Sequence, residues 1–223
     1  MHGEELQPID APLYDPRHEH DACGVGFIAD IDGRHAGRVV PMALEALAAL
    51  AHRGARAADD LTGDGSGVAF PISSRFRARL LADAGVAPHD GERAAVAMCF
   101  LPGDGSEAAS RLVEDRAAVE GLAVIGWRDV PVDHALVAGR RVGETPVIRQ
   151  AIVVGDRRSP PLRFARRLAA FRRVVERDAP EIAVVSASQS QVVYKGLFVG
   201  DELGRFYGDL GGGDDLDARY AAF

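Results

Sequence analysis

The side chains around Cys23 are the first in this sequence that could carry out chemistry. Two histidines, His18 and His20, precede this cysteine in the segment RHEHDAC. Imidazole and thiolate are good zinc ligands, but structural zinc sites usually combine two such clusters, and His52 and His89 stand alone. The cysteine therefore has three possible roles: a metal ligand, a small buried apolar residue, or a nucleophile.

A nucleophilic Cys23 needs a base. A catalytic cysteine requires a neighbouring base or a lowered pKa, and no His/Asp pair in the sequence stands out as its partner. Cleavage before Cys23 would supply the α-amino group of the same residue. Such a group has a pKa of about 7.7 to 8.0, close to the value of about 8.5 for a free thiol, so a proton passes easily between them. Residues 1–22, charged and containing three prolines, are typical of an extended or mobile leader.

Arg53 follows the Leu-rich segment VVPMALEALAALAH, which predicts a helix from about Pro41 to Arg53. Proline suits the first turn of a helix, and glycine, here Gly54, suits the position just after its end. A guanidinium at this end complements the helix dipole. The other possible role is a buried cation that fixes a nucleophile or a substrate carbonyl. The residues alone leave both roles open.

The glycine-rich loop DLTGDGSGVAF partly matches two ligand-binding motifs. As a calcium loop it has Asp60, Thr62, Asp64 and Gly65 at positions 1, 3, 5 and 6. Position 12 is Pro71, where a bidentate glutamate is required, so this interpretation fails. As a dinucleotide loop it should follow a strand and open a helix, and the predicted order is the reverse. Two interpretations remain: a simple turn, or a loop whose backbone lies close to an active centre.

The elements that would position these residues alternate between strand and helix patterns. Residues 23–31 predict a strand that enters a turn at Asp32 and Gly33. Further strands are predicted over 68–72, 93–102, 122–132 and 145–155, and as a strand pair over 181–200 with a turn at 188–190. Helices are predicted over 73–85 and 105–121, both with serine caps, over 160–178, and briefly after residue 200. Intermingled helices and hairpin-like strand pairs indicate an α+β or layered α/β fold.

Composition limits the possible classes of protein. The 223 residues are 47% hydrophobic and 26% charged, with a net charge of -7, which is typical of a soluble globular protein and argues against nucleic-acid binding. No apolar run approaches the roughly 18 to 20 residues of a membrane helix, and the N-terminus lacks a signal-peptide pattern. Two cysteines provide no disulfide framework, so the predicted location is the reducing cytoplasm.

Several segments together resemble a known family. LYDPRHEHDACGVGFIADIDGR and ALEALAALAHRGARAADDLTGDGSGVAF are similar to the start of the class II glutamine amidotransferase domain of the glutamate synthase large subunit. The resemblance continues through GWRDVPVD, TPVIRQAIV, SQVVYKGLFV and ELGRFYGDL, from about Leu13 to the end. It implies a domain of the N-terminal nucleophile type, an α/β/β/α four-layer sandwich over residues 23–223.

The resemblance also implies roles for particular residues. Residues 1–22 correspond to a propeptide whose removal exposes Cys23, the nucleophile that attacks the side-chain amide of glutamine. Arg53 in His-Arg-Gly corresponds to an arginine near that nucleophile, which favours a functional role for it. The loop residues Thr62, Gly63, Asp64 and Gly65, together with Gly24, correspond to positions close to the active centre.

The full-length parent enzyme of this family carries FMN and an iron–sulfur cluster, and aminates 2-oxoglutarate with the ammonia released. Two cysteines cannot hold even a three-iron cluster beside a free nucleophile, so no cofactor and no metal is expected in this chain. The expected partners are glutamine, the remaining synthase domains, and a small subunit or electron donor.

The sequence ends at DARYAAF, before the His-x-Arg-Tyr/Phe-Ser-Thr-Asn and His-Asn-Gly-Glu-Ile-Asn motifs of the family. The second motif supplies the oxyanion hole, and loss of one such donor costs about 100- to 1000-fold in rate. We therefore expect an incomplete sandwich that is inactive alone, with an open sheet edge, open apolar faces, and RYAAF as an unpaired apolar stub. The alternative is a non-catalytic pseudo-amidotransferase or partner-binding module of the same fold.

Overall fold

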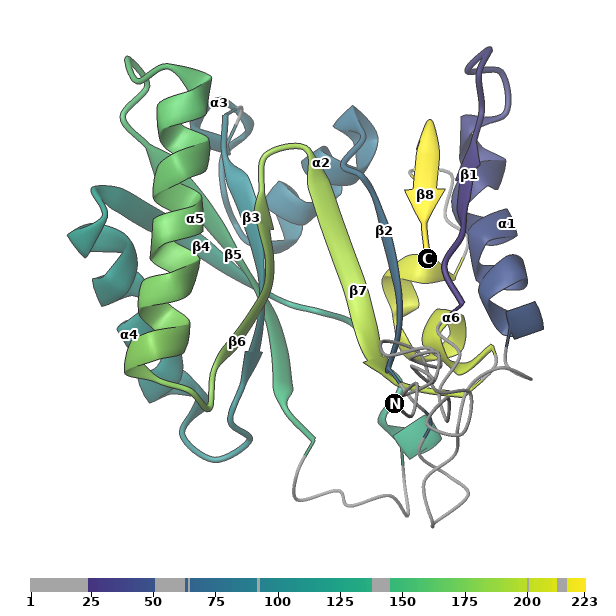
Figure 1. The fold of residues 1–223 in the computed structure, drawn as a ribbon. Coiled ribbons are helices and arrows are strands. Elements are labelled where there is room, and N and C mark those ends of the chain that lie inside the picture. The colour runs from purple at the N-terminus through teal and green to yellow at the C-terminus, as the bar shows by residue number, and fades with distance from the viewer. Residues whose placement is uncertain are drawn as a thin grey trace, which may run out of the picture.

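The computed structural model describes residues 24–50, 63, 65–91, 93–137, 145–199, 201–211 and 216–223 (Figure 1). The helices there are α1 (Ala36–Ala49), α2 (Ser74–Asp83), α3 (Pro88–Gly91), α4 (Ser106–Val119), α5 (Pro161–Asp178) and α6 (Glu202–Phe206), with 3-10 turns η3 (His134–Val137) and η5 (Gly208–Leu210). The strands are β1 (Phe27–Ala29), β2 (Gly65–Pro71), β3 (Ala95–Leu101), β4 (Leu122–Asp129), β5 (Val147–Gly155), β6 (Ala183–Ser188), β7 (Gln191–Leu197) and β8 (Tyr220–Ala222).

The strands form two antiparallel sheets. The first sheet has the order β1-β8-β2-β7 and the second sheet the order β4-β5-β3-β6. The hairpin of β6 and β7 passes from one sheet to the other, so a single turn at residues 189–190 links them (Figure 1). Helices and antiparallel sheets mixed in this way are the predicted α+β class.

Apolar side chains on the two faces of the second sheet belong to two separate cores. Phe70 on β2 and Tyr194 on β7 share one core with Met98 of the second sheet. On the opposite face of the second sheet, Ala97 packs with Phe171 of α5, and α4 and α5 cover this side (Figure 1). The second sheet is therefore buried on both faces, which explains the continuous apolar character of AVAMCFL in β3.

The predicted start of the first helix is wrong. Helix α1 begins at Ala36, and Pro41 lies inside it rather than in its first turn. Proline removes one backbone hydrogen bond within a helix, but Val39 and Val40 are almost completely buried on α1, and their burial offsets that loss. The predicted end at Arg53 lies outside the described residues.

The predicted serine cap is present at α2 and absent at α4. Ser73 caps α2 as predicted, because its hydroxyl accepts a hydrogen bond from the Phe76 amide at 3.0 Å. Ser106 does not cap α4: it is the first helical residue, and the preceding Gly105 has a φ of 84°, where glycine is favoured. Gly121, with a φ of 66°, follows the end of α4 as predicted.

The prediction that RYAAF is an unpaired stub is wrong. Its residues form β8, which lies between β1 and β2 in the first sheet. Gly26 and Phe223 extend this pairing with two reciprocal backbone hydrogen bonds of 2.8 and 2.9 Å. Ala221 is completely buried. The strand forms because β1 and β2 offer backbone partners on both sides, which a three-residue apolar pattern does not reveal.

Candidate functional site

Three of the predicted site residues lie in the described part of the chain. They are Gly24, Gly63 and Gly65. Cys23, Arg53, Thr62 and Asp64 lie outside the described residues. The site is therefore built from the segments that lead directly into the four undescribed positions.

Gly24 lies where the start of β1 meets the end of α1. A Cβ atom on this glycine would come within 2.8 Å of the Leu50 Cδ1 atom, and Leu50 is the residue that closes α1. A larger residue at this position would displace the Leu50 side chain. The fold thus brings the residue after Cys23 against a residue three positions before Arg53.

Gly63 and Gly65 differ sharply in their surroundings. A Cβ atom on the buried Gly63 would lie 2.4 Å from the backbone oxygen of Phe198, a distance that no real Cβ contact shows. A Cβ atom on Gly65 would meet nothing within 4 Å. Gly65 is exposed and pairs with Leu197 at the end of β7. Gly63 is therefore packed tightly against the Phe198 backbone, whereas Gly65 has open space around it.

These glycines occupy one end of the first sheet, called here the Gly24 end and defined by Gly24, Leu50, Gly63 and Phe198. The ladders make β1 parallel in direction to β2 and antiparallel to β7 and β8. Strands β1 and β2 therefore begin where β7 and β8 end, as Figure 1 shows. The Gly24 end thus holds the residue after Cys23, the end of α1 and Gly63 of the glycine-rich loop.

Ser66 adds an unexplained polar atom at this end. It follows Gly65 on β2, and its Oγ atom is buried with no hydrogen-bond partner in the described part of the chain. Buried hydroxyl groups almost always have a partner, so Ser66 is an exception among the described residues. Ser66 was not predicted as a site residue, because a serine in a glycine-rich loop carries no distinct signal.

One face of the first sheet is apolar and exposed. The register aligns Phe27, Ala222 and Ala69 on the face opposite to the buried Phe70. On β1 and just before it, Phe27 is 69% and Val25 88% exposed, and Leu197 on β7 is 60% exposed. These three apolar side chains lie on the same face of the first sheet. Isolated exposed apolar residues are ordinary, but several on one sheet face indicate a contact surface.

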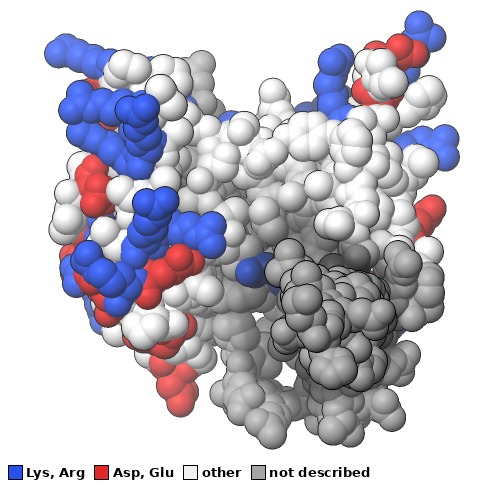
Figure 2. Space-filling view, viewed as in Figure 1, with Lys and Arg blue, Asp and Glu red and all other residues white. Residues whose placement is uncertain are grey.

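Charged side chains gather away from this face. Figure 2 shows few of them over β7 and β2 and many over α4 and α5. The basic residues of α5 are Arg163, Arg166, Arg167, Arg172, Arg173 and Arg177. Acidic partners lie among them: Arg172 pairs with Glu176 and Arg177 with Asp178. None of the described helices is both long and apolar enough to cross a membrane.

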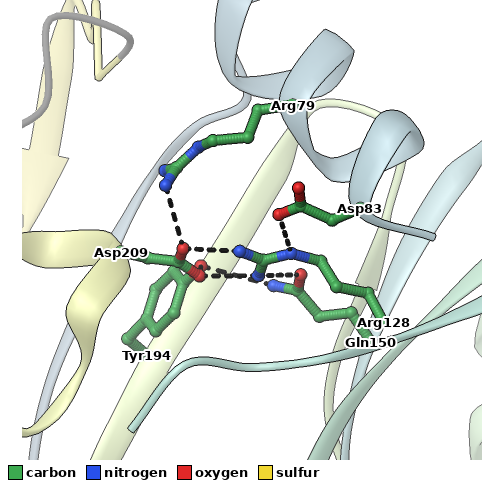
Figure 3. A network of polar contacts seen from close by, with 6 residues as sticks. All are labelled: Arg79, Asp83, Arg128, Gln150, Tyr194 and Asp209. Carbon is green, nitrogen blue, oxygen red and sulfur yellow. Dashed lines mark hydrogen bonds and ion pairs between the residues drawn. The ribbon is translucent and has the colours of Figure 1, made fainter.

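A buried ionic network joins the two sheets (Figure 3). Arg128 on β4 donates to both carboxylate oxygens of Asp209 in η5, at 2.8 and 2.7 Å. Tyr194 on β7 donates to the same carboxylate at 2.7 Å, and Arg79 on α2 approaches it to 3.3 Å. Gln150 on β5 accepts from Arg128 and donates to Tyr194, at 3.0 and 3.3 Å.

The electrostatics of this network favour a structural role. Burial alone would lower the pKa of Arg128, but the hydrogen bonds and charge of Asp209 raise it above its ordinary value. Burial, reinforced by Asp209, raises the pKa of Tyr194, so its hydroxyl stays protonated and donates. Both oxygens of Asp209 are occupied, and the carboxylate therefore has no vacant position for a substrate. The residues of this network were not predicted as a group, because they are dispersed in the sequence. Three of them, Arg128, Tyr194 and Asp209, lie in the segments GWRD, VVYK and YGDL.

Cys99 is the cysteine that the structure describes, and it does not fit a metal or a redox cofactor. It is fully buried on β3, where burial raises the pKa of its thiol to about 12. Metal ligation requires the thiolate, which this environment disfavours. Within the described ranges, no group of three or more His, Cys, Asp or Glu residues is placed to hold a metal ion.

We predict that Cys99 resists alkylation in the folded chain. At pH 8 a thiol with a pKa of about 12 is almost entirely protonated and is also closed off from solvent. Treatment with iodoacetamide followed by peptide mass spectrometry should show modification of Cys99 only after unfolding. Modification of Cys99 at the rate of a free thiol in the folded chain would contradict its burial.

Comparison with known proteins identifies the family. The model of the class II glutamine amidotransferases matches residues 23–220. The NADPH glutamate synthase large chain of Azospirillum brasilense is 35% identical over 218 residues, which cover 94% of this chain and 14% of that protein. The ferredoxin-dependent glutamate synthase of Spinacia oleracea is 38% identical over 201 residues, covering 86% of this chain and 12% of its own length.

A third relative, ferredoxin-dependent glutamate synthase 2 of Synechocystis, is 37% identical over 195 residues. This chain spans 12% of its length, so these relatives are all much longer proteins. The match of the family model to nearly the whole chain confirms the resemblance on which the site residues were predicted. The chain belongs to the class II glutamine amidotransferases.

Proposed function

We propose that the Gly24 end is a glutaminase site in which Cys23 is the nucleophile. The observation that carries this proposal is that the family match begins next to the glycine that packs against the end of α1. The family match begins at Cys23, and the next residue, Gly24, packs directly against the end of α1. A residue that starts the family domain and adjoins a close-packed glycine is well placed to act as an N-terminal nucleophile.

The proposed reaction uses a single residue as nucleophile and base. Removal of residues 1–22 gives Cys23 a free α-amino group, which accepts the thiol proton because the two pKa values are close, about 7.7 to 8.0 and about 8.5. The thiolate attacks the side-chain amide carbon of glutamine, the α-ammonium group returns its proton to the amide nitrogen, and the C–N bond breaks so that ammonia leaves and a thioester remains. Water then hydrolyses the thioester, which releases glutamate and restores the thiol.

Arg53 and the loop around Gly63 are proposed to complete this site. Three residues of chain span at most about 11 Å, so the contact of Leu50 with Gly24 keeps Arg53 within reach of the nucleophile. Thr62 and Asp64 flank Gly63, which is held against the Phe198 backbone at the same end. Arg53 would orient the nucleophile or the substrate carbonyl, and the loop would bring backbone groups close to the glutamine.

The activity of the whole enzyme is a further proposal, because the chain spans only 12–14% of the relatives' length. In it, the ammonia released at Cys23 would aminate 2-oxoglutarate in another domain. FMN and an iron–sulfur cluster would belong to another part of that enzyme. NADPH or ferredoxin, which the relatives' names mention, would supply the electrons.

The exposed apolar face of the first sheet is proposed to contact further parts of such a synthase. Val25, Phe27 and Leu197 are the exposed side chains that support this. A layer packed on this face would be consistent with the four-layer α/β/β/α sandwich of the family. The same face also favours the alternative function, a non-catalytic module of this fold that binds a partner.

Labelling with a glutamine analogue tests the nucleophile. Intact-mass measurement of the purified chain should show loss of residues 1–22. A diazoketone analogue of glutamine should add one label, because alkylation needs the nucleophile but not the complete turnover that this chain is expected to lack. Cys23→Ala should keep the leader and remain unlabelled, since it lacks both thiol and processing. Cys99→Ala is the matched control and should be labelled like the unchanged chain. Equal labelling of Cys23→Ala would overturn the proposal and leave the partner-binding module as the better account.

A further inference from the structure

We propose that a cavity at the far end of the second sheet binds a free α-amino acid with an apolar side chain. The cavity has a volume of about 380 Å³ and is bordered by Gln189, which lies before β7. The Gly24 end lies beyond the other end of this seven-residue strand, about 20 Å away. The cavity is thus separate from the proposed glutaminase site, and the inference goes beyond that function.

The floor of the cavity is apolar. Val86, Ile125, Val154 and Phe164 line it. The register between β4 and β5 shifts between Val124 and Gly126, so Ile125 is the extra residue of a β-bulge. A β-bulge changes the direction in which a side chain leaves the strand. The Ile125 side chain is 37% exposed and lines the cavity. A ligand with an apolar side chain would cover this surface.

The rim is held rigid by bonds between three segments of the chain. Arg93 donates from Nη1 to the Arg157 backbone oxygen at 2.7 Å, and Arg157 donates from Nη2 to the His89 oxygen at 2.9 Å. Gln189 donates from Nε2 to the Arg93 oxygen at 2.7 Å. A rim that is ordered before a ligand arrives loses less conformational freedom on binding.

The unused polar groups on the rim have both signs of charge. Arg93 makes no ion pair within the described residues, and a guanidinium has four donors left after its bond to Arg157. Ser159 is 8% exposed, and its hydroxyl has no hydrogen bond in the described part of the chain, although its amide bonds to Asp156. Arg93 and Ser159 together suit a carboxylate.

Asp156 provides the opposite charge. Its Oδ1 atom accepts from the Arg158 amide at 2.9 Å, and no bond to Oδ2 occurs among the described residues. The cavity lining includes two arginines and two aspartates, which balance in charge, and Arg157 is already paired with Asp90. A lining that is neutral overall but charged locally favours a zwitterion over a simple anion or cation. Together with the apolar floor, this defines an apolar α-amino acid.

Calorimetric titration of the 223-residue chain with L-leucine tests the ligand class. Two analogues separate the charges: 4-methylpentanoate lacks the ammonium group, and 3-methylbutylamine lacks the carboxylate. Leucine should bind at least about tenfold more tightly than either, because each loses one charge-assisted contact. If 4-methylpentanoate binds as tightly as leucine, the cavity is an anion site and the assignment fails. If leucine does not bind, the assignment fails as well.

Variants then locate the ligand. Arg93→Gln and Asp156→Asn should each weaken leucine binding about tenfold or more, and asparagine keeps the oxygen that accepts from Arg158. Ile125→Trp should block binding by filling the cavity. Arg173→Gln, on the exposed face of α5, should leave binding unchanged. Thermal unfolding of each variant confirms that it is folded, and unchanged leucine affinity in a folded Asp156→Asn would overturn the proposal.

Discussion

Asp209→Ala should lower the free energy of unfolding by about 3–5 kcal/mol. Asp209 is completely buried and accepts from Nη1 and Nη2 of the Arg128 guanidinium, whose side chain is only 3% exposed. Removal of this carboxylate leaves the buried charge with Asp83, a 43% exposed side chain 2.8 Å from Nε, as its remaining ion-pair partner among the described residues. It also leaves the Tyr194 hydroxyl without its acceptor. Denaturation followed by the fluorescence of the single tryptophan, Trp127, measures the change.

The matched control is Asp129→Ala. Arg149 and Asp129 form an ion pair of the same length, 2.7 Å, but the Asp129 side chain is 78% exposed. Exposed pairs contribute less than about 1 kcal/mol, because water and salt screen them. The two variants therefore separate burial from pairing. If both variants lose the same free energy of unfolding, the buried network contributes no more to stability than an exposed ion pair.

Gly63→Ala should destabilise the chain by about 1–3 kcal/mol, the usual range for an added group in a packed site. The new methyl group would lie 2.4 Å from the Phe198 backbone oxygen, so the backbone itself must move. Because Gly63 belongs to the Gly24 end, labelling by the glutamine analogue should fall as well. Denaturant midpoints and labelling rates measure the two effects.

Gly65→Ala provides the comparison two residues away. Its methyl group would meet nothing within 4 Å, and Gly65 is not among the described glycines with positive φ. Alanine also reduces the freedom of the unfolded chain, so stability should stay equal or rise slightly. A larger loss at Gly65 than at Gly63 would contradict the packing at this end.

Elements with dense apolar patterns were predictable from the sequence. The strand around Cys99, helix α5 and the hairpin of β6 and β7 lie where the patterns placed them. The start of α1 was not predictable, because the local preference of Pro41 for a first turn opposes the burial of Val39 and Val40. That burial depends on strands that come later in the chain, and tertiary packing decided the outcome.

The candidate site was predictable only in part. Motifs singled out Gly24, Gly63 and Gly65. The motifs do not reveal that Gly63 is tightly packed whereas Gly65 has open space around it. The ionic network was not predicted, because Arg128 and Asp209 are 81 positions apart, and the segments GWRDVPVD and ELGRFYGDL that contain them do not indicate that the two residues pair. Such a pair is defined by the arrangement of the two sheets rather than by spacing along the chain.

The central position of β8 has a consequence for the order of events during synthesis. Among the described strands β1 is hydrogen-bonded to β8 alone, so its ladder partner is made almost 200 residues later. Contacts this distant in sequence form slowly, and a chain emerging from the ribosome cannot form them early. The segment that begins at Gly24 therefore stays without its sheet until Tyr220–Ala222 have been translated. Any maturation step at Cys23 that needs an assembled first sheet must wait for that moment.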